Sequence, residues 1–150
     1  MRKFRFRLAT LLKIREAARD ERHARLAQAY EAEETLKGRK TDLEEQRVGL
    51  RQRFHEAAQP GPVDLDQLVE SHRYEMVVMA EEQVLVDQMK LIGEEIERRR
   101  GALVEADREV QVLERLREKQ QNRHREEAMR QEMKELDEIA GQLARRTKTE

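Results

Sequence analysis

Histidine and carboxylate side chains are the first candidates for chemistry in this chain of 150 residues, which contains no cysteine. His23, His55, His72 and His124 never form the i, i+4 pair that presents two metal ligands on one helical face. None of the six glycines opens a phosphate-binding loop after a strand. The many Asp and Glu have no predicted cleft that would shift their pKa toward catalysis. We therefore expect a protein that is not an enzyme, with no cofactor, metal site or small-molecule substrate.

The composition limits the kind of fold that could position any of these side chains. The chain is 42% charged and 3% aromatic, with no Trp, which is too little apolar material for a large globular core. Leu, Ile, Val and Met nevertheless recur at steps of three and four, which gives a helix one continuous apolar seam. This spacing predicts a coiled coil.

The segment Pro60-Gly61-Pro62 contains the only two prolines and separates two long stretches with helical spacing. It predicts an all-α fold, a long antiparallel two-helix coiled-coil hairpin in which the second helix is longer than the first. We expect a single domain over 1–150, with helix 1 at about 6–58, a turn at 59–63, helix 2 at about 64–144 and a frayed tail at 145–150. Asp64 is expected to cap the second helix.

Charged residues within the seam predict how the two helices are aligned. A turn centred near Gly61 places facing residues at numbers that sum to about 122, which pairs Arg47 with Glu75 and Lys40 with Glu82. The same sum pairs Arg15 with Asp107, Leu43 with Met79, Leu36 with Val86 and Leu26 with Ile96. We expect these opposite charges to specify the alignment of the helices.

This alignment leaves the second helix without a partner from Asn122 onward. An apolar stripe continues there at helical spacing, formed by Met129, Met133, Leu136, Ala140 and Leu143. An uncovered apolar stripe indicates a surface that binds another protein. The alternative is a frayed, solvated helix end that merely continues the pattern.

The charges are unevenly distributed, although the net charge is only −1. Residues 1–25 carry nine Lys or Arg and three acids, whereas residues 63–97 carry ten acids and two bases. The hairpin places the basic N-terminal segment beside a second basic group, which consists of Arg115, Arg117, Lys119, Arg123 and Arg125. This end of the hairpin is expected to bind an acidic protein surface. Nucleic acid is not an expected partner, because almost no aromatic side chains are present to stack on bases.

The sequence gives no sign of a membrane or secretory segment. No apolar run approaches the roughly 20 residues needed to span a bilayer, and the first residues lack the apolar region of a secretory signal. The absence of cysteine agrees with a reducing compartment. We therefore expect the protein in the cytoplasm.

Two motifs near the ends of the hairpin sequence resemble those of a known family. The first is Phe4-x-Phe6-x-Leu8-x-x-Leu11-Leu12-x-Ile14-Arg15, and the second is Glu109-Val-x-Val-Leu113-Glu-Arg-Leu116-Arg-Glu-Lys119-Gln. Together with the segment 133–140, they resemble the bacterial flagellar FliJ family over nearly the whole chain.

The resemblance implies a non-catalytic coiled-coil stalk of the flagellar type III protein export apparatus. Such a stalk inserts into the pore of the hexameric flagellar export ATPase, contacts the cytoplasmic domain of the export gate membrane protein and handles export chaperones. It would be cytoplasmic, peripherally associated with the inner-membrane export apparatus, and an elongated monomer when free.

The same resemblance, combined with the basic end, selects candidate residues for the ATPase. The expected ATPase-binding residues are Phe4, Leu8, Leu11, Leu12, Arg15, Leu113, Leu116, Arg117 and Lys119. The gate is expected to meet the region near the turn of the hairpin, where no family motif is present, so the candidates there are the apolar or aromatic residues Leu50, Phe54, Tyr74 and Val78.

Three other functions are compatible with a coiled-coil hairpin. One is the equivalent stalk protein of a virulence-type secretion system. A second is a self-assembling structural coiled coil, in which the stripe at 129–143 pairs with copies of itself. The third is a holdase chaperone that binds unfolded clients without any ATPase.

Overall fold

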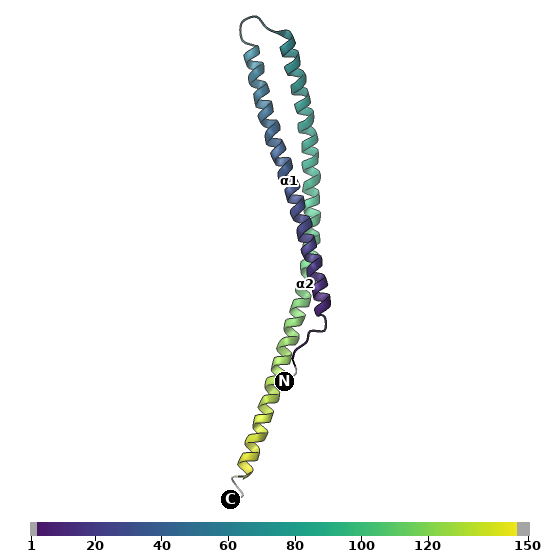
Figure 1. The fold of residues 1–150 in the computed structure, drawn as a ribbon, viewed down its shortest axis with the longest axis vertical. Coiled ribbons are helices and arrows are strands. Elements are labelled where there is room, and N and C mark those ends of the chain that lie inside the picture. The colour runs from purple at the N-terminus through teal and green to yellow at the C-terminus, as the bar shows by residue number, and fades with distance from the viewer. Residues whose placement is uncertain (1–2, 147–150) are drawn as a thin grey trace. The chain divides into compact units, whose positions relative to one another are not determined.

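The computed structural model describes residues 3–146 and consists of two helices joined by one loop (Figure 1). Helix α1 spans Ala9–Ala57 and helix α2 spans Leu65–Arg146, with 49 and 82 residues. The two helices pack against each other as a hairpin, and no strand occurs within 3–146. The predicted all-α hairpin with a longer second helix is confirmed.

Hydrogen bonds of the preceding residues mark where each helix begins. Helix α1 begins at Ala9 rather than near residue 6, after a turn in which the N–H of Ala9 donates to the carbonyl of Phe6 at 3.3 Å. Before α2, the Oδ1 atom of Asp64 accepts hydrogen bonds from the backbone N–H groups of Asp66 and Gln67, at 3.1 and 3.3 Å. This is the predicted N-cap, and it satisfies donors that the first helical turn leaves unpaired.

The chain forms two compact units, and each has its own apolar core. Over the described residues, unit 1 comprises 3–20 and 104–146, and unit 2 comprises 21–103. In the described part of unit 1, the buried cluster consists of Phe6, Leu12 and Val110. Unit 2 contains two buried clusters, one of Leu26, Ala29 and Ile96, the other of Leu43, Leu50, Val78 and Leu85. Both helices run without a break from one unit into the other.

At every second position of its apolar seam, α2 buries the residue immediately before the predicted one. Val78 and Leu85 are buried, at 2% and 3% exposure, whereas the predicted Met79 and Val86 are 47% and 55% exposed. Consecutive apolar residues such as Val77-Val78-Met79 allow either choice on periodicity alone. The observed choice also brings Ile92 to the seam in place of Gly93, so it buries more apolar surface.

The predicted ion pairs of unit 2 are wrong. Arg47 Nη1 lies 3.2 Å from Glu82 Oε2, one heptad beyond the predicted partner Glu75. Glu75 instead lies 3.9 Å from His72 on its own helix. Lys40, predicted to face Glu82, pairs with Glu44 of α1 at 3.8 Å. The predicted proximity of Leu26 and Ile96 is confirmed by their common cluster.

The predicted pair in unit 1 is also wrong, by a smaller shift. Arg15 Nη1 lies 2.7 Å from Glu109 Oε2 rather than beside Asp107. Asp107 approaches Arg19 at 4.0 Å. These side chains are all partly exposed, and ion pairs of that kind contribute little to stability. The apolar seam therefore sets the alignment, and the charges pair with whatever the seam brings near them.

Substitution of the adjacent valines 77 and 78 tests the observed seam. Val78→Ala is expected to lower the free energy of unfolding by about 2 to 3 kcal/mol, because it removes buried methyl groups and leaves a cavity. Val77→Ala is the matched control, since Val77 is 52% exposed, and it should change stability by less than about 0.5 kcal/mol. Urea unfolding followed by circular dichroism measures both. Equal losses for the two variants would contradict the observed seam.

Candidate functional site

The segment before α1 forms an N-terminal arm, residues 3–8, that packs against α2 in unit 1. Phe6 is 7% exposed and belongs to the same buried cluster as Val110. The ring of Phe4 meets that of His124 edge-on, with 5.7 Å between centroids. A non-helical chain advances up to about 3.3 Å per residue, against 1.5 Å in a helix. The short arm therefore covers α2 as far as His124, and the uncovered part of α2 begins later than the predicted Asn122.

Four of the nine predicted ATPase-binding residues come together at this arm. Leu12 is buried in the cluster, and Phe4, Leu113 and Leu116 pack against it while remaining partly exposed. Their proximity joins the two sequence motifs, which lie about a hundred residues apart in the chain. The cluster holds unit 1 together and exposes only the edges of its outer members.

The other five predicted ATPase-binding residues lie at the surface around this cluster. Leu8 and Leu11 are 37% and 38% exposed. Arg15 is paired with Glu109, while Arg117 and Lys119 are exposed on α2. Residues 112–125 carry five Lys or Arg and two Glu, and all five basic side chains are exposed. An exposed apolar patch surrounded by basic side chains is complementary to an acidic protein surface that has an apolar centre.

The predicted gate-binding residues fall into two groups in unit 2. Leu50 and Val78 are buried in one cluster, so their main contacts are with the opposite helix. Phe54 and Tyr74 are 48% and 49% exposed. Tyr74 of α2 lines a shallow depression together with Leu50 and Arg53 of α1. The surface available to a partner is therefore formed by the two aromatic residues and not by the buried pair.

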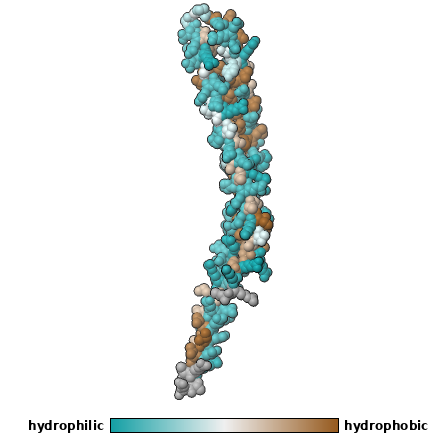
Figure 2. Space-filling view, viewed as in Figure 1, coloured by the Kyte–Doolittle hydropathy of each residue, from teal (hydrophilic) through white to brown (hydrophobic). Residues whose placement is uncertain are grey.

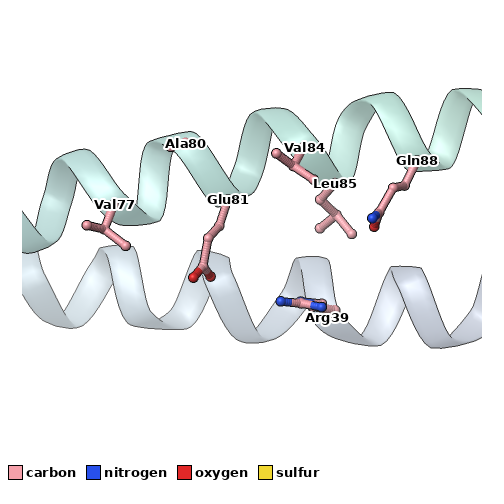
Figure 3. Close-up of a pocket in the computed structure, with 7 residues that line it drawn as sticks. All are labelled: Arg39, Val77, Ala80, Glu81, Val84, Leu85 and Gln88. Carbon is pink, nitrogen blue, oxygen red and sulfur yellow. The ribbon is translucent and has the colours of Figure 1, made fainter.

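A groove between the helices of unit 2 was not predicted from the sequence. Val77, Ala80, Val84 and Leu85 of α2 line it, and Arg39 of α1 lies opposite them (Figure 3). The remaining lining residues are Glu81 and Gln88. The sequence signal is a second set of apolar residues at seven-residue steps, Val77, Val84 and Leu91, whose members are 52%, 56% and 65% exposed. The sequence prediction followed only the seam that faces α1, so it did not include this outer stripe.

The pKa values of Glu95 and Arg100 are both shifted in the direction that favours the charged form, which is not what proton transfer requires. The pKa of Glu95 is lowered, chiefly because Arg99 donates a hydrogen bond to its carboxylate. The pKa of Arg100 is raised, first by its hydrogen bond with the hydroxyl of Tyr30 on α1 and then by Glu97. Arg99 also donates to the backbone carbonyl of Arg25, so these residues link the two helices of unit 2.

Within 3–146, no group of three or more His, Asp or Glu side chains is placed to hold a metal ion. Over the same range, neither helix has a stretch long and apolar enough to cross a bilayer.

Comparison with known proteins shows the family to which this chain is related. Residues 4–149 match the family model described as Flagellar FliJ protein. The match includes both terminal motifs and the whole hairpin, and it confirms the resemblance seen in the sequence. No curated protein and no solved structure matches the chain.

A substitution in the arm tests whether it is held by the cluster. Phe6→Ala should raise the rate of tryptic cleavage after Arg5 and Arg7 at least about tenfold, because removing a buried Phe side chain costs about 3 kcal/mol of the packing that holds the arm. Mass spectrometry of the early digest measures this rate. Phe54→Ala is the control with the same residue type at an exposed position. An unchanged rate in Phe6→Ala would show that the cluster does not hold the arm.

Proposed function

The chain belongs to the flagellar FliJ protein family, and we propose that it is the non-catalytic coiled-coil stalk of the flagellar type III export apparatus. Family membership makes it a coiled-coil protein related to flagellar export. The proposal adds specific partners: the hexameric export ATPase, the cytoplasmic domain of the export gate membrane protein, and export chaperones. The protein would act in the cytoplasm, at the periphery of the inner-membrane apparatus.

The observation that carries the ATPase contact is the apolar cluster of unit 1 with its basic surround. Phe4, Leu113 and Leu116 expose apolar edges, and Leu8 and Leu11 extend that surface. Arg117 and Lys119 add exposed positive charge beside it. An acidic lining in the pore of an ATPase ring would attract this surface at long range, and the apolar edges would then fix its position.

The stalk would act mechanically and not through chemistry of its own. A ring of six subunits presents six similar surfaces around one pore, and a single chain can contact them only unequally. Unequal contact favours one order of nucleotide turnover among the subunits, because it stabilises some conformations over others.

The gate contact is proposed for the exposed surface of unit 2. Phe54 and Tyr74 supply aromatic rings that are about half exposed. The groove in Figure 3 adds Val77 and Val84, which lie on α2 near Tyr74 in sequence. Aromatic residues beside an apolar groove are typical anchors of a protein interface. Export chaperones would use surfaces that neither partner covers.

ATP turnover by the export ATPase of the same organism tests the first contact. The wild-type chain is expected to promote hexamer assembly and raise turnover several-fold. Arg117→Glu combined with Lys119→Glu should weaken that effect at least about fivefold, because it places two repulsive charges at the basic surface. Arg73→Glu with Lys90→Glu makes the same charge change in unit 2 and should behave as wild type. If the wild-type chain did not raise ATP turnover, the stalk function would be excluded.

Binding to the purified cytoplasmic domain of the gate protein tests the second contact. Tyr74→Asp should weaken binding about tenfold, because it replaces an exposed aromatic anchor with a charge. Val112→Asp introduces the same charge at a position in unit 1 that is 64% exposed, and it should bind as wild type does. Isothermal titration calorimetry measures both affinities. Equal weakening by the two variants would place the gate contact elsewhere.

A further inference from the structure

Helix α2 carries three neighbouring rows of apolar residues in the part of unit 2 that adjoins the loop. Each row repeats at steps of seven, and the rows begin at Val77, Val78 and Met79. The middle row continues with Leu85 and Ile92 and packs in the clusters shared with α1. The large apolar side chains of the two outer rows are between 47% and 65% exposed. Figure 2 shows apolar residues in brown at the surface of this part, near the loop at the top of the view.

We propose that the loop end of α2, residues 65–89, has a second packing on α1, reached by rotation of α2 about its own axis. In this second packing, Met79 and Val86 replace Val78 and Leu85 in the seam. The hairpin then has two states at the end where the gate contact is proposed. A partner that binds one state better would shift the population toward it. Only that use by a partner rests on the proposed function, because the rotation is a property of the chain alone.

The seam of α2 consists of two alternating sets of positions, and a rotation toward Met79 exchanges only one of them. The set that stays contains Glu75, Glu82 and Met89, which are all partly buried. Its last two members each follow a residue of the Met79 row by three positions, so both sets lie on one face of the helix. Successive residues are about 100° apart around a helix, and the exchange of one set turns the seam by half of that. Met89 therefore stays in the seam.

No comparable rotation brings the opposite outer row into the seam. Met89 follows Val84 by five positions, which places the two side chains on different faces of α2. A seam through that row would lose Met89 and gain only Glu81 and Gln88. It would bury less apolar surface, so it is not an alternative packing. The two outer rows thus differ in what they can do, although both are exposed.

The exchange itself removes and adds similar apolar volume. One Val and one Leu leave the seam, and one Met and one Val enter it. Met and Leu have similar volumes, and exchanges that conserve volume are tolerated with little loss of stability. The ion pair of Arg47 with Glu82, which joins the two helices here, is partly exposed and therefore holds their alignment only weakly.

Gly93 limits how far along α2 the rotation extends. It continues the Met79 row without a side chain, so at this level the second packing would lose Ile92 and gain nothing. Ile92 packs against the buried cluster around Ile96, which keeps the first packing. Glycine has the most permissive backbone, so the twist between the two packings is expected at this residue. At the other end, every residue of the loop 58–64 is exposed, so the loop does not anchor the start of α2.

Thiol labelling of a single introduced cysteine tests the rotation, because the natural chain has none. In the full chain with Val78→Cys, the labelling rate measures how often residue 78 leaves the seam. Addition of Met79→Gln and Val86→Gln should slow labelling at least about fivefold, because burial of an unpaired amide disfavours the second packing. Addition of Val77→Gln and Val84→Gln instead is the matched control. It should leave the rate unchanged, because this row does not enter the seam.

A polar middle row should make the second packing the favoured one. In a chain with Val78→Gln and Leu85→Gln, Met79→Cys should be labelled at least about tenfold more slowly than Val77→Cys. In the natural background, these two cysteines should be labelled at similar rates, because residues 77 and 79 are 52% and 47% exposed.

Either of two results would overturn the proposal. One is equal labelling at positions 77 and 79 in the chain with the polar middle row. The other is an equal effect of the two glutamine pairs on labelling at position 78. Both measurements use the chain without the ATPase or the gate domain, so their failure is distinct from failure of the proposed function.

Discussion

The rest of the structure depends on burial of one apolar seam between α1 and α2. The chain has too few apolar residues for a globular core, so almost every large one that becomes buried does so at this seam. In unit 2, the clusters around Leu43 and Ile96 place Arg47 beside Glu82 and Arg100 beside Tyr30. The polar contacts follow from this packing, because ion pairs that are partly exposed contribute too little to align two long helices by themselves.

The arm extends the same constraint beyond the start of α1. Phe4 and Phe6 occupy the surface of α2 where a longer first helix would otherwise lie, and they do so without helical structure. The apolar side chains of α2 can thus be covered by apolar residues that are not helical. This explains why the two sequence motifs, at residues 4–15 and 109–120, belong to one site: each supplies half of a single buried cluster.

Much of this fold could be predicted from the sequence, and the errors have one physical source. Pro60 and Pro62, the Asp64 cap and the spacing of Leu26, Leu43 and Leu50 correctly predicted the loop, the start of α2 and the α1 seam. Adjacent apolar residues at 77–79 and 84–86 left the α2 seam ambiguous by one residue. The ion pairs were then predicted by matching charges, although exposed charges have many acceptable partners. Apolar volume, which distinguishes Ile92 from Gly93, was the better guide.

The candidate sites were predicted with uneven success for a related reason. Family resemblance selected residues in contact with one another at the arm, whereas an apolar side chain near the loop could equally belong to the seam or to the surface. Leu50 and Val78 belong to the seam, while Val77 and Val84, each one residue before a buried position, form an outer stripe. A helix that carries two apolar stripes must expose one of them when only one helix packs against it. The same reasoning applies beyond residue 128, where α2 keeps one apolar stripe and α1 supplies no neighbour, so the side chains of that stripe stay exposed.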